Sequence, residues 1–394
     1  MTRLVDIVNF NADASCLDSQ KWLSCLSGGS DSQFCKWLFL YVRHRKLMAL
    51  GMTGTTISDL KMYNPEAIAI VKNNPDIFQV ILRPYSHDIA LLRTPQGFRF
   101  NLAAGIAVMK ATFESASLYY LPPEFMMTNE QIHILSNLGI KATFVNSSRY
   151  PVDLAARIPD KAYFVKGILG SMLGCIPVNG NLTQLYLRSI QLFDTDEWNK
   201  TIASVGHHCY LWRDGESPFL IPDGIEREDF WLANCHAERM HLGEEEYSDV
   251  INTGMYQSYP IHSFLEWMKE FRMIGYLNRI EEIEKHLSQL HMIAKCIWLL
   301  TINSDILSSV EKKSPLIRLR LLENREQIQQ FQILRSERAF EGEEYLALLQ
   351  RCMTDEKYPC ELINPTEAHL KKAKGRIEHL KSLEPTWKNA MHCS

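Results

Sequence analysis

Long apolar runs, an excess of charge of one sign and a leader-like start are all missing from this sequence. Its most apolar run, residues 297–302, is far shorter than the ~18–20 residues that cross a bilayer. Lysine and arginine total 42 against 46 aspartate and glutamate, so the basic excess of a general nucleic-acid binder is absent. The first residues also lack the apolar region of a signal peptide. We therefore expect a cytoplasmic protein with no nucleic-acid partner and no membrane partner.

Paired metal ligands and nucleotide-binding loops are missing as well. None of the ten cysteines forms a Cys-x-x-Cys pair, so their spacing gives no zinc signal. Neither Gly-x-Gly-x-x-Gly nor Gly-x-x-x-x-Gly-Lys-Ser/Thr occurs, which leaves nucleotide-cofactor chemistry without a motif. We expect reduced, mostly buried thiols and no cofactor.

What the chain does contain is an alternation of strand-like and helix-like segments over its first two thirds. The expected strands are residues 4–10, 78–82, 118–121, 142–145 and 186–193. Apolar residues at helical spacing fill the segments between them, which predicts parallel strands joined by helices. In such α/β folds ligand-binding residues gather at the carboxyl ends of the strands. Polar residues recur at those ends, namely Asp13, His87, Glu124, Asp194 and Asp196.

Helical periodicity alone continues after about Pro260. Apolar residues recur at spacings of three and four over residues 263–309, and residues 316–349 and 366–383 are also expected to be helical. This pattern is typical of a helical bundle. We therefore expect a barrel domain over residues 1–257 and a helical region, packed on the barrel, over residues 258–394.

Four segments share their residue pattern with one known family. Pro122, Pro123 and Glu124 end a strand and lead to a helix, residues 83–92 read Arg-Pro-Tyr-Ser-His-Asp-Ile-Ala-Leu-Leu, and residues 192–197 and 299–305 carry acidic groups. These segments resemble the Trp-Pro-Pro-Glu, Pro-Tyr-Ser-His, nucleophile and general-acid segments of glycoside hydrolase family 57. The resemblance implies a distorted (β/α)7 barrel followed by helices, and an enzyme that acts on a glycosidic bond.

The resemblance also implies roles for individual carboxylates. A retaining glycosidase needs an ionised carboxylate as nucleophile and a protonated one as acid/base, roughly 5–5.5 Å apart. The matching positions are Asp196, with Glu197 as a one-residue alternative, for the nucleophile and Asp305 for the acid/base. Glu124 is a further candidate, because the two prolines before it fix the backbone at a strand end.

Other residues are candidates for binding the sugar. Aromatic faces stack on sugar rings and an arginine binds an acidic sugar or a phosphate through two parallel hydrogen bonds. The residues expected to bind a carbohydrate substrate are Asp13, His87, Arg83, Trp198 and Trp212.

Two alternatives remain open. The segment Asn-Phe-Asn-Ala-Asp at residues 9–13 is similar to the opening of chitooligosaccharide deacetylases, in place of the His-x-His-Gln-Pro of family 57. Asp13 and His87, with His207, His208 or His236, would then hold a divalent metal such as Zn²⁺ for hydrolysis of an N-acetylated sugar. The second alternative is a barrel that binds carbohydrate without catalysis.

Overall fold

The computed structural model describes residues 3–11, 25–114, 117–146, 161–205, 208–243, 245–251, 256–257, 271–302, 343, 345–354 and 368–385. Asp13, His207 and Asp305 lie outside these residues. No described helix has the length and apolar character needed to cross a membrane.

The pairing of seven strands of the described residues closes them into a ring. In order around the ring they are β1 (Arg3–Phe10), β2 (Met48–Met52), β3 (Phe78–Ile81), β4 (Tyr119–Tyr120), β6 (Ala142–Asn146), β8 (Met172–Val178) and β9 (Cys209–Asp214). Parallel pairing joins β9 to β1, β1 to β2, β2 to β3, β4 to β6 and β6 to β8. A parallel bridge from Leu82 to Tyr120 and a 2.9 Å hydrogen bond from Asn179 N to Tyr210 O close the two remaining gaps. The predicted (β/α)7 barrel is confirmed.

Shorter strands lie at the edges of this ring or, for β5 and β12, form a separate two-stranded sheet. They are β5 (Met126–Met127), which pairs with β12 (Tyr256–Gln257), β7 (Tyr163–Lys166), which pairs with β8 and β11 (Ser248–Ile251), and β10 (Glu238–Arg239), which pairs with the start of β1.

Helices cover the outside of the ring. They are α2 (Gln33–His44), α3 (Gly54–Tyr63), α4 (Pro65–Asn73), α5 (Pro95–Phe113), α6 (Asn129–Asn137), α7 (Gly180–Leu192), α8 (Asp196–Ser204), α9 (Ser217–Leu220) and α10 (Gly224–Asn234). Local signals in the sequence account for several helix starts. Asn64 caps α4 ahead of Pro65, and Thr128 forms a reciprocal capping box with Gln131 at α6.

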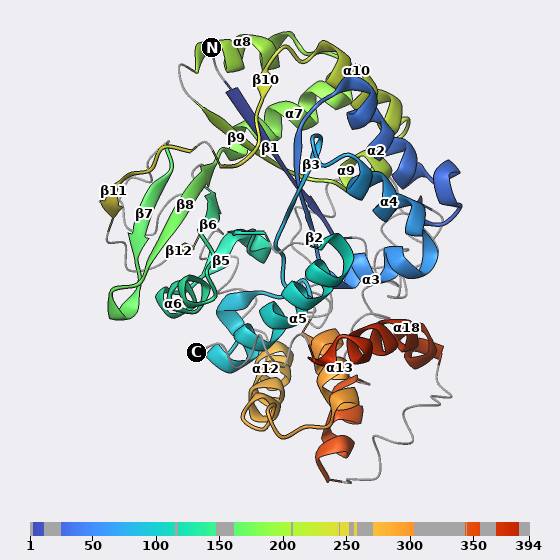
Figure 1. Cartoon of the computed structure of the whole chain (residues 1–394), viewed down its shortest axis with the longest axis vertical. Coiled ribbons are helices and arrows are strands. Elements are labelled where there is room, and N and C mark those ends of the chain that lie inside the picture. The colour runs from blue at the N-terminus through green and yellow to red at the C-terminus, as the bar shows by residue number, and fades with distance from the viewer. Residues whose placement is uncertain are drawn as a thin grey trace.

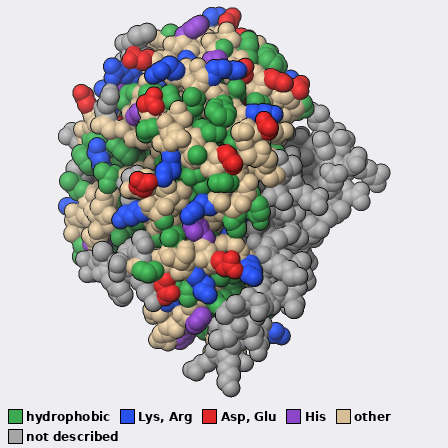
Figure 2. Space-filling view, turned by 45° about the vertical axis from the view of Figure 1, so that its right-hand side comes forward, with side chains coloured by type: hydrophobic (Ala, Val, Ile, Leu, Met, Phe, Trp, Pro, Cys, Tyr) green, Lys and Arg blue, Asp and Glu red, His purple; other side chains and the backbone are tan. Residues whose placement is uncertain are grey.

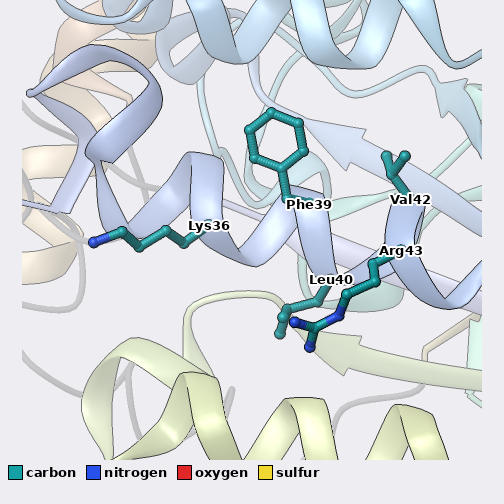
Figure 3. Close-up of a pocket in the computed structure, with 5 residues that line it drawn as sticks. All are labelled: Lys36, Phe39, Leu40, Val42 and Arg43. Atoms are coloured by element: carbon teal, nitrogen blue, oxygen red, sulfur yellow. The ribbon is translucent and has the colours of Figure 1, made fainter.

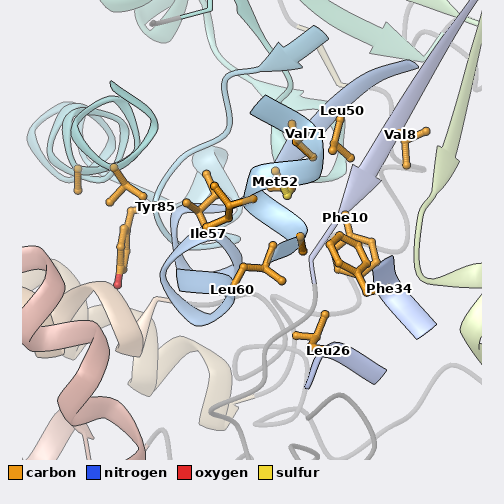
Figure 4. Packing of buried hydrophobic residues seen from close by; sticks show 14 of the residues in the cluster. Val8, Phe10, Leu26, Phe34, Leu50, Met52, Ile57, Leu60, Val71 and Tyr85 are labelled. Carbon is orange, nitrogen blue, oxygen red and sulfur yellow. The ribbon is translucent and has the colours of Figure 1, made fainter. Parts of the chain in front are cut away.

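The strands alternate between two apolar layers, as side chains on successive residues must. Val5 and Ile7 of β1 point into the barrel, where they meet Ala49, Ile81, Phe144 and Ile176. Val8 and Phe10 point outward against the helices, with Leu50 and Met52 of β2 and Ile57 and Leu60 of α3 (Figure 4). The barrel interior is therefore a packed core and not a channel.

Two sequence expectations were wrong in this region. Residues 186–193 form the second half of α7 and its end instead of a strand, because Leu182, Tyr186 and Ile190 are buried at a spacing of four. Apolar residues at spacings of three and four also predict one helix over residues 30–50, but the helix ends at His44 and β2 follows. Arg45 adopts a left-handed conformation with φ 49° and its backbone N–H donates to Tyr41 O and Val42 O, which ends the helix.

The C-terminal helices α12 (Phe271–Glu284), α13 (Met292–Thr301) and α18 (Ala368–Ser382) pack on one side of the barrel, at the bottom of Figure 1. Two buried salt bridges attach them. Arg93, just before α5, donates to Glu284 Oε1 at 2.8 Å, and Arg376 of α18 donates to both oxygens of Asp59 of α3, at 2.8 and 2.6 Å. The predicted helical region packed on the barrel is therefore present in the described residues.

Candidate functional site

Two acidic residues lie at the carboxyl end of β9, where Asp214 is the last residue of the strand and Glu216 follows it. Asp214 Oδ1 accepts a 3.1 Å hydrogen bond from Asn9 Nδ2, and Glu216 Oε1 accepts one from the backbone N–H of Asn11. Gly215 between them donates to Asn9 O at 2.6 Å. A Cβ on this glycine would lie 2.9 Å from the side chains of Val8 and Phe10, so only glycine allows the chain to lie this close to β1. The end of β1 therefore holds both carboxylates in place.

A strained turn at the end of β4 holds a third carboxylate. Glu124 and Phe125 have φ angles of 53° and 56°, a left-handed conformation that is uncommon for residues other than glycine. Each such residue costs on the order of 1–3 kcal/mol and persists only where the surroundings enforce it. Pro122 and Pro123 precede it, and the Phe125 side chain is buried in the barrel core. As the prolines predicted, Glu124 lies at a strand end on a fixed backbone.

The ends of β4 and β9 meet across the barrel. Two strands, β6 and β8, separate them on one side of the ring, and three, β1 to β3, on the other. Phe125 and Trp212 bridge this distance with ring centroids 5.1 Å apart. Since Trp212 and Asp214 are two residues apart on one strand, they point to the same face. Glu124 and Asp214 thus belong to two segments that face each other.

Arg83 is more deeply buried than these carboxylates, and their charges act on it. It follows β3 and is 2 % exposed, whereas Asp214 is exposed to solvent and Glu124 and Glu216 are partly buried. Burial lowers the pKa of Arg83 to about 10, against the opposing effect of Tyr120 and of the Glu216, Asp214 and Glu124 carboxylates. The guanidinium therefore stays charged at neutral pH within the field of all three acids.

The carboxyl group of Glu216 has a raised pKa. Loss of hydration is the main cause and the charge of Asp214 the second, and together they raise the pKa of Glu216 to about 8. The hydrogen bond from Asn11 and the charge of Arg83 act in the opposite direction. Because the Asp214 and Glu216 carboxyl groups act on each other, we treat the proton as belonging to the pair. The pair holds that proton at neutral pH.

A buried ion network supports β9 from behind. Arg213, which points away from the barrel interior, donates to both oxygens of Asp6 at 2.8 and 3.0 Å and to Glu228 of α10 at 2.9 Å. Arg239 donates to Asp6 Oδ2 at 2.6 Å, and Tyr186 donates to Glu228 Oε2 at 2.5 Å. With two arginines and two carboxylates the network is neutral, and it fixes the orientation in which Trp212 and Asp214 face inward.

Two of the predicted site residues lie elsewhere. Asp196 occupies the first turn of α8 and is exposed, and its backbone N–H donates to Asp194 Oδ1 at 2.9 Å. The strand that was expected to present it is helix α7. Trp198 is 0 % exposed, packs on Trp231 at 5.4 Å and donates from Nε1 to Cys235 Sγ. The indole of Trp198 is therefore enclosed by its neighbours and has no exposed face for the substrate contact that the sequence predicted.

The remaining predicted residues divide into two groups. Arg83, Glu124 and Trp212 come together at the carboxyl ends of the strands, and His87 lies 7 % exposed in the loop after β3. Asp13, Asp305 and His207 lie outside the described residues, so their roles stay predictions. Within the described residues no cluster of three or more His, Cys, Asp or Glu side chains is arranged to hold a metal ion.

Sequence reasoning missed Asn9, Asp214 and Glu216 as site residues. A signal was available, because Asp214 and Glu216 flank a glycine directly after a short, mostly apolar segment, residues 209–212. Residues 206–254 showed no clear periodicity, however, and the pairing of β9 with β1 joins segments about 200 residues apart.

Two other surface features were compared with this site as candidate functional sites, and neither carries a comparable group of carboxylates. The face in Figure 2 carries basic and acidic side chains intermixed, without a large field of one sign. A shallow hollow on the outer surface is lined by five residues of α2, namely Lys36, Phe39, Leu40, Val42 and Arg43 (Figure 3). It lies on the helical layer and contains no carboxylate or histidine.

Comparison with known proteins identifies the fold. No protein-family model and no curated protein sequence matches the chain. Among solved structures, a 4-alpha-glucanotransferase from Thermococcus litoralis matches with a TM-score of 0.63 and 10 % identity, over 78 % of this chain and 56 % of that chain. A GH57 branching enzyme from Thermococcus kodakaraensis matches with a TM-score of 0.62 and 10 % identity, over 98 % of this chain and 95 % of that one.

A second GH57-type branching enzyme, from Pyrococcus horikoshii, matches with a TM-score of 0.63 and 10 % identity, over 98 % of this chain and 94 % of that one. The two branching enzymes thus match over nearly their whole length, barrel and C-terminal helices together. The chain has the fold of the glycoside hydrolase family 57 structures.

Proposed function

We propose that the protein is a carbohydrate-active enzyme that cleaves or transfers a glycosidic bond by a retaining double displacement. Glu124 is the nucleophile and Asp214 the acid/base. The observation that carries this proposal is that Glu124 and Asp214 lie on facing segments joined by the Phe125–Trp212 contact, with both charges acting on Arg83. This pair takes the place of Asp196 and Asp305.

The environments of the two carboxylates support different roles. The positive charge of Arg83 favours the ionised form of Glu124, which is the form that attacks. Asp214 is coupled to Glu216, and that pair holds a proton at neutral pH. Asp214 is the more exposed member, since Glu216 is partly buried and bound to the N–H of Asn11. Asp214 is therefore the member placed to pass the proton to substrate.

The reaction then runs in two steps. A Glu124 oxygen bonds to the anomeric carbon while the bond to the leaving oxygen breaks, and Asp214 donates its proton to that oxygen. Next, Asp214 takes a proton from water, or from a sugar hydroxyl in a transferase, and the resulting nucleophile displaces Glu124 from the anomeric carbon. The configuration at that carbon is retained. The partly exposed ring of Trp212, which packs on the buried Phe125, lies two residues before Asp214 and can contact a sugar ring.

The fold neighbours favour a glycosidic substrate. They are described as branching enzymes and a glucanotransferase, and one was solved in complex with glucose. The two-carboxylate reaction needs no metal ion. Turnover should therefore survive dialysis against a chelator, whereas loss of turnover that added Zn²⁺ restores would favour the metal-dependent deacetylase.

Paired substitutions test the assignment. Glu124→Gln and Asp214→Asn should each lower kcat on activated aryl glycosides or oligosaccharides by at least about 10³-fold, as expected for groups that act only in the transition state. Asp196→Asn is the matched control on the barrel exterior and should leave kcat unchanged. Wild-type turnover in Glu124→Gln, or loss of turnover in Asp196→Asn, would contradict the proposal, and product NMR would check retention.

A further inference from the structure

The side chain of Arg83 is unusual for a buried arginine. Its Nε and Nη2 atoms are buried and have no hydrogen-bond partner in the part of the chain that the structure describes. The side chain crosses over Gly51 of β2, where a Cβ would lie 3.1 Å from Arg83 Cδ and 3.1 Å from Leu121 Cδ2. The absence of a side chain at residue 51 thus leaves the space in which the arginine lies.

The two unpartnered atoms belong together chemically. Nε–H and one N–H of Nη2 point in the same direction from one edge of the planar guanidinium. That edge matches two oxygens of a carboxylate or phosphate through parallel hydrogen bonds. Leaving such donors unpaired in a buried site costs free energy, so an occupant with two oxygen acceptors would be favoured. The geometry points to a ligand group rather than to internal pairing.

A third unpartnered atom lies at the same end of the barrel. Asn9 is 7 % exposed, and its Nδ2 donates to Asp214 while its Oδ1 has no partner in the described residues. An amide oxygen in this position can accept a hydrogen bond from a sugar hydroxyl. The site therefore offers a charged two-donor edge beside a neutral acceptor, which suits a sugar ring that carries an anionic group.

The nearby carboxylates do not oppose this occupant as strongly as their number suggests. In the reactive state the Asp214–Glu216 pair holds a proton, and Glu124 and Arg83 balance each other. Arg83 also keeps its charge at neutral pH. An incoming anion therefore meets the positive edge of Arg83 in a site whose three acids, with one proton and one arginine, keep a single net negative charge.

We propose that the Nε–Nη2 edge of Arg83 binds the carboxylate of a uronic-acid residue, so that the substrate is an acidic glycan. This proposal rests on the proposed function, because it places that residue between Glu124 and Asp214. A sugar phosphate presents the same oxyanion chemistry and is distinguished by experiment. Arg83 is then a specificity-determining residue.

Equilibrium binding tests the proposal without turnover. Calorimetry on the full, unsubstituted chain would compare D-glucuronate with D-glucuronamide, D-glucose and glucose 6-phosphate, none of which has a glycosidic bond to cleave. Glucuronate is expected to bind at least about tenfold more tightly than glucuronamide and glucose. Tighter binding of glucose 6-phosphate than of glucuronate would overturn the uronic-acid assignment, and equal affinity for glucuronate and glucuronamide would overturn a role for the charge.

A substitution then locates the effect. Arg83→Lys keeps the charge but removes the two-donor edge, and it should weaken glucuronate about tenfold or more while glucose binding changes less than about twofold. Arg188→Gln, at an exposed arginine on α7, is the matched control and should change neither. An equal loss for both sugars in Arg83→Lys would contradict the proposal.

The comparison of glucuronate with glucuronamide needs no substitution at Arg83, so it decides the matter even if Arg83→Lys fails to fold. The outcome is also separate from the proposed function. A protein that loses turnover in Glu124→Gln but prefers glucose keeps the proposed reaction and loses only the acidic substrate.

Discussion

Trp212 of β9 and Phe125 after β4 contact each other edge to face, with ring centroids 5.1 Å apart and an angle of 75° between the rings. Phe125 directly follows the candidate nucleophile Glu124, and Trp212 lies two residues before the candidate acid/base Asp214. The contact therefore sets both the separation of the two strand ends and the apolar surface between them. We therefore expect substitutions of Trp212 to weaken substrate binding.

Trp212→Ala should raise KM about tenfold, which corresponds to ~1.4 kcal/mol, because a partly exposed aromatic face is lost from the site. The effect on kcat should be smaller. Trp198→Phe is the matched control, since that indole is buried between helices and its Nε1 donates to Cys235 Sγ. It should lower the melting temperature and leave KM unchanged. Steady-state kinetics of both variants would check this, and an unchanged KM in Trp212→Ala would count against the site.

The pH dependence of turnover should report the Asp214–Glu216 pair. Burial and the charge of Asp214 raise the pKa of Glu216 to about 8, so the pair loses its proton and the acid catalyst is lost above that pH. In Glu216→Gln the second carboxyl group is absent, and the remaining acid holds its proton less tightly. The high-pH limb of kcat/KM should move to lower pH by one unit or more. A profile identical to wild type would show that Glu216 is not coupled to the reaction.

Local signals predicted part of this site and missed the rest for a physical reason. Glu124 could be predicted because two prolines mark its turn, and Arg83 because it follows a short apolar strand. Trp198 and Trp212 are both tryptophans close to acidic residues in the sequence. Trp198 nevertheless lies in a helix interface, whereas Trp212 lies near the carboxyl end of β9. Only long-range contacts separate them. Asp214 depends on the pairing of β9 with β1, which no local pattern specifies.

The same reasoning applies to the fold. Caps and prolines marked the starts of α4 and α6, because those signals act within one turn of helix. The segment that became α7 contains β-favouring residues, and its helical form depends on burying Leu182, Tyr186 and Ile190 against the helical layer. Tertiary packing overrode local preference there.

Stability should respond to pH through Asp88, which shares Arg93 with Glu284 at the contact between the barrel and α12. Burial, and less strongly the charge of Glu284, raise the pKa of Asp88 to about 7 against the effect of Arg93. The folded state thus binds more protons than the unfolded state between about pH 4 and 7, and this group's contribution to stability falls as pH rises through that range.

Asp88→Asn cannot titrate, so the free energy of unfolding should fall less between pH 4 and 7 than it does in wild type, by about 1–3 kcal/mol. Urea unfolding at several pH values measures this difference. Asp76→Asn, at an exposed aspartate, should leave the wild-type slope in place. If the two variants showed the same slope, Asp88 would not be the titrating group.

The attachment of α18 to the barrel should depend on the pair formed by Arg376 and Asp59. Both side chains are buried, and the arginine donates to both carboxylate oxygens. Arg376→Met leaves a buried negative charge without its partner and should destabilise the protein by about 3–5 kcal/mol. Asp59→Asn combined with Arg376→Met removes that charge, so the double variant should recover much of the loss.

Lys374→Ala on the same helix is the control, because the contact of Lys374 with Glu378 is exposed, and its effect should stay within about 0.5 kcal/mol. Urea and thermal unfolding of the four proteins would measure these differences. If Arg376→Met cost no more than Lys374→Ala, the pair would not hold α18. A larger loss in Arg376→Met than in Lys374→Ala would instead show that the C-terminal helices stabilise the barrel through α3, which Thr53 alone separates from the end of β2.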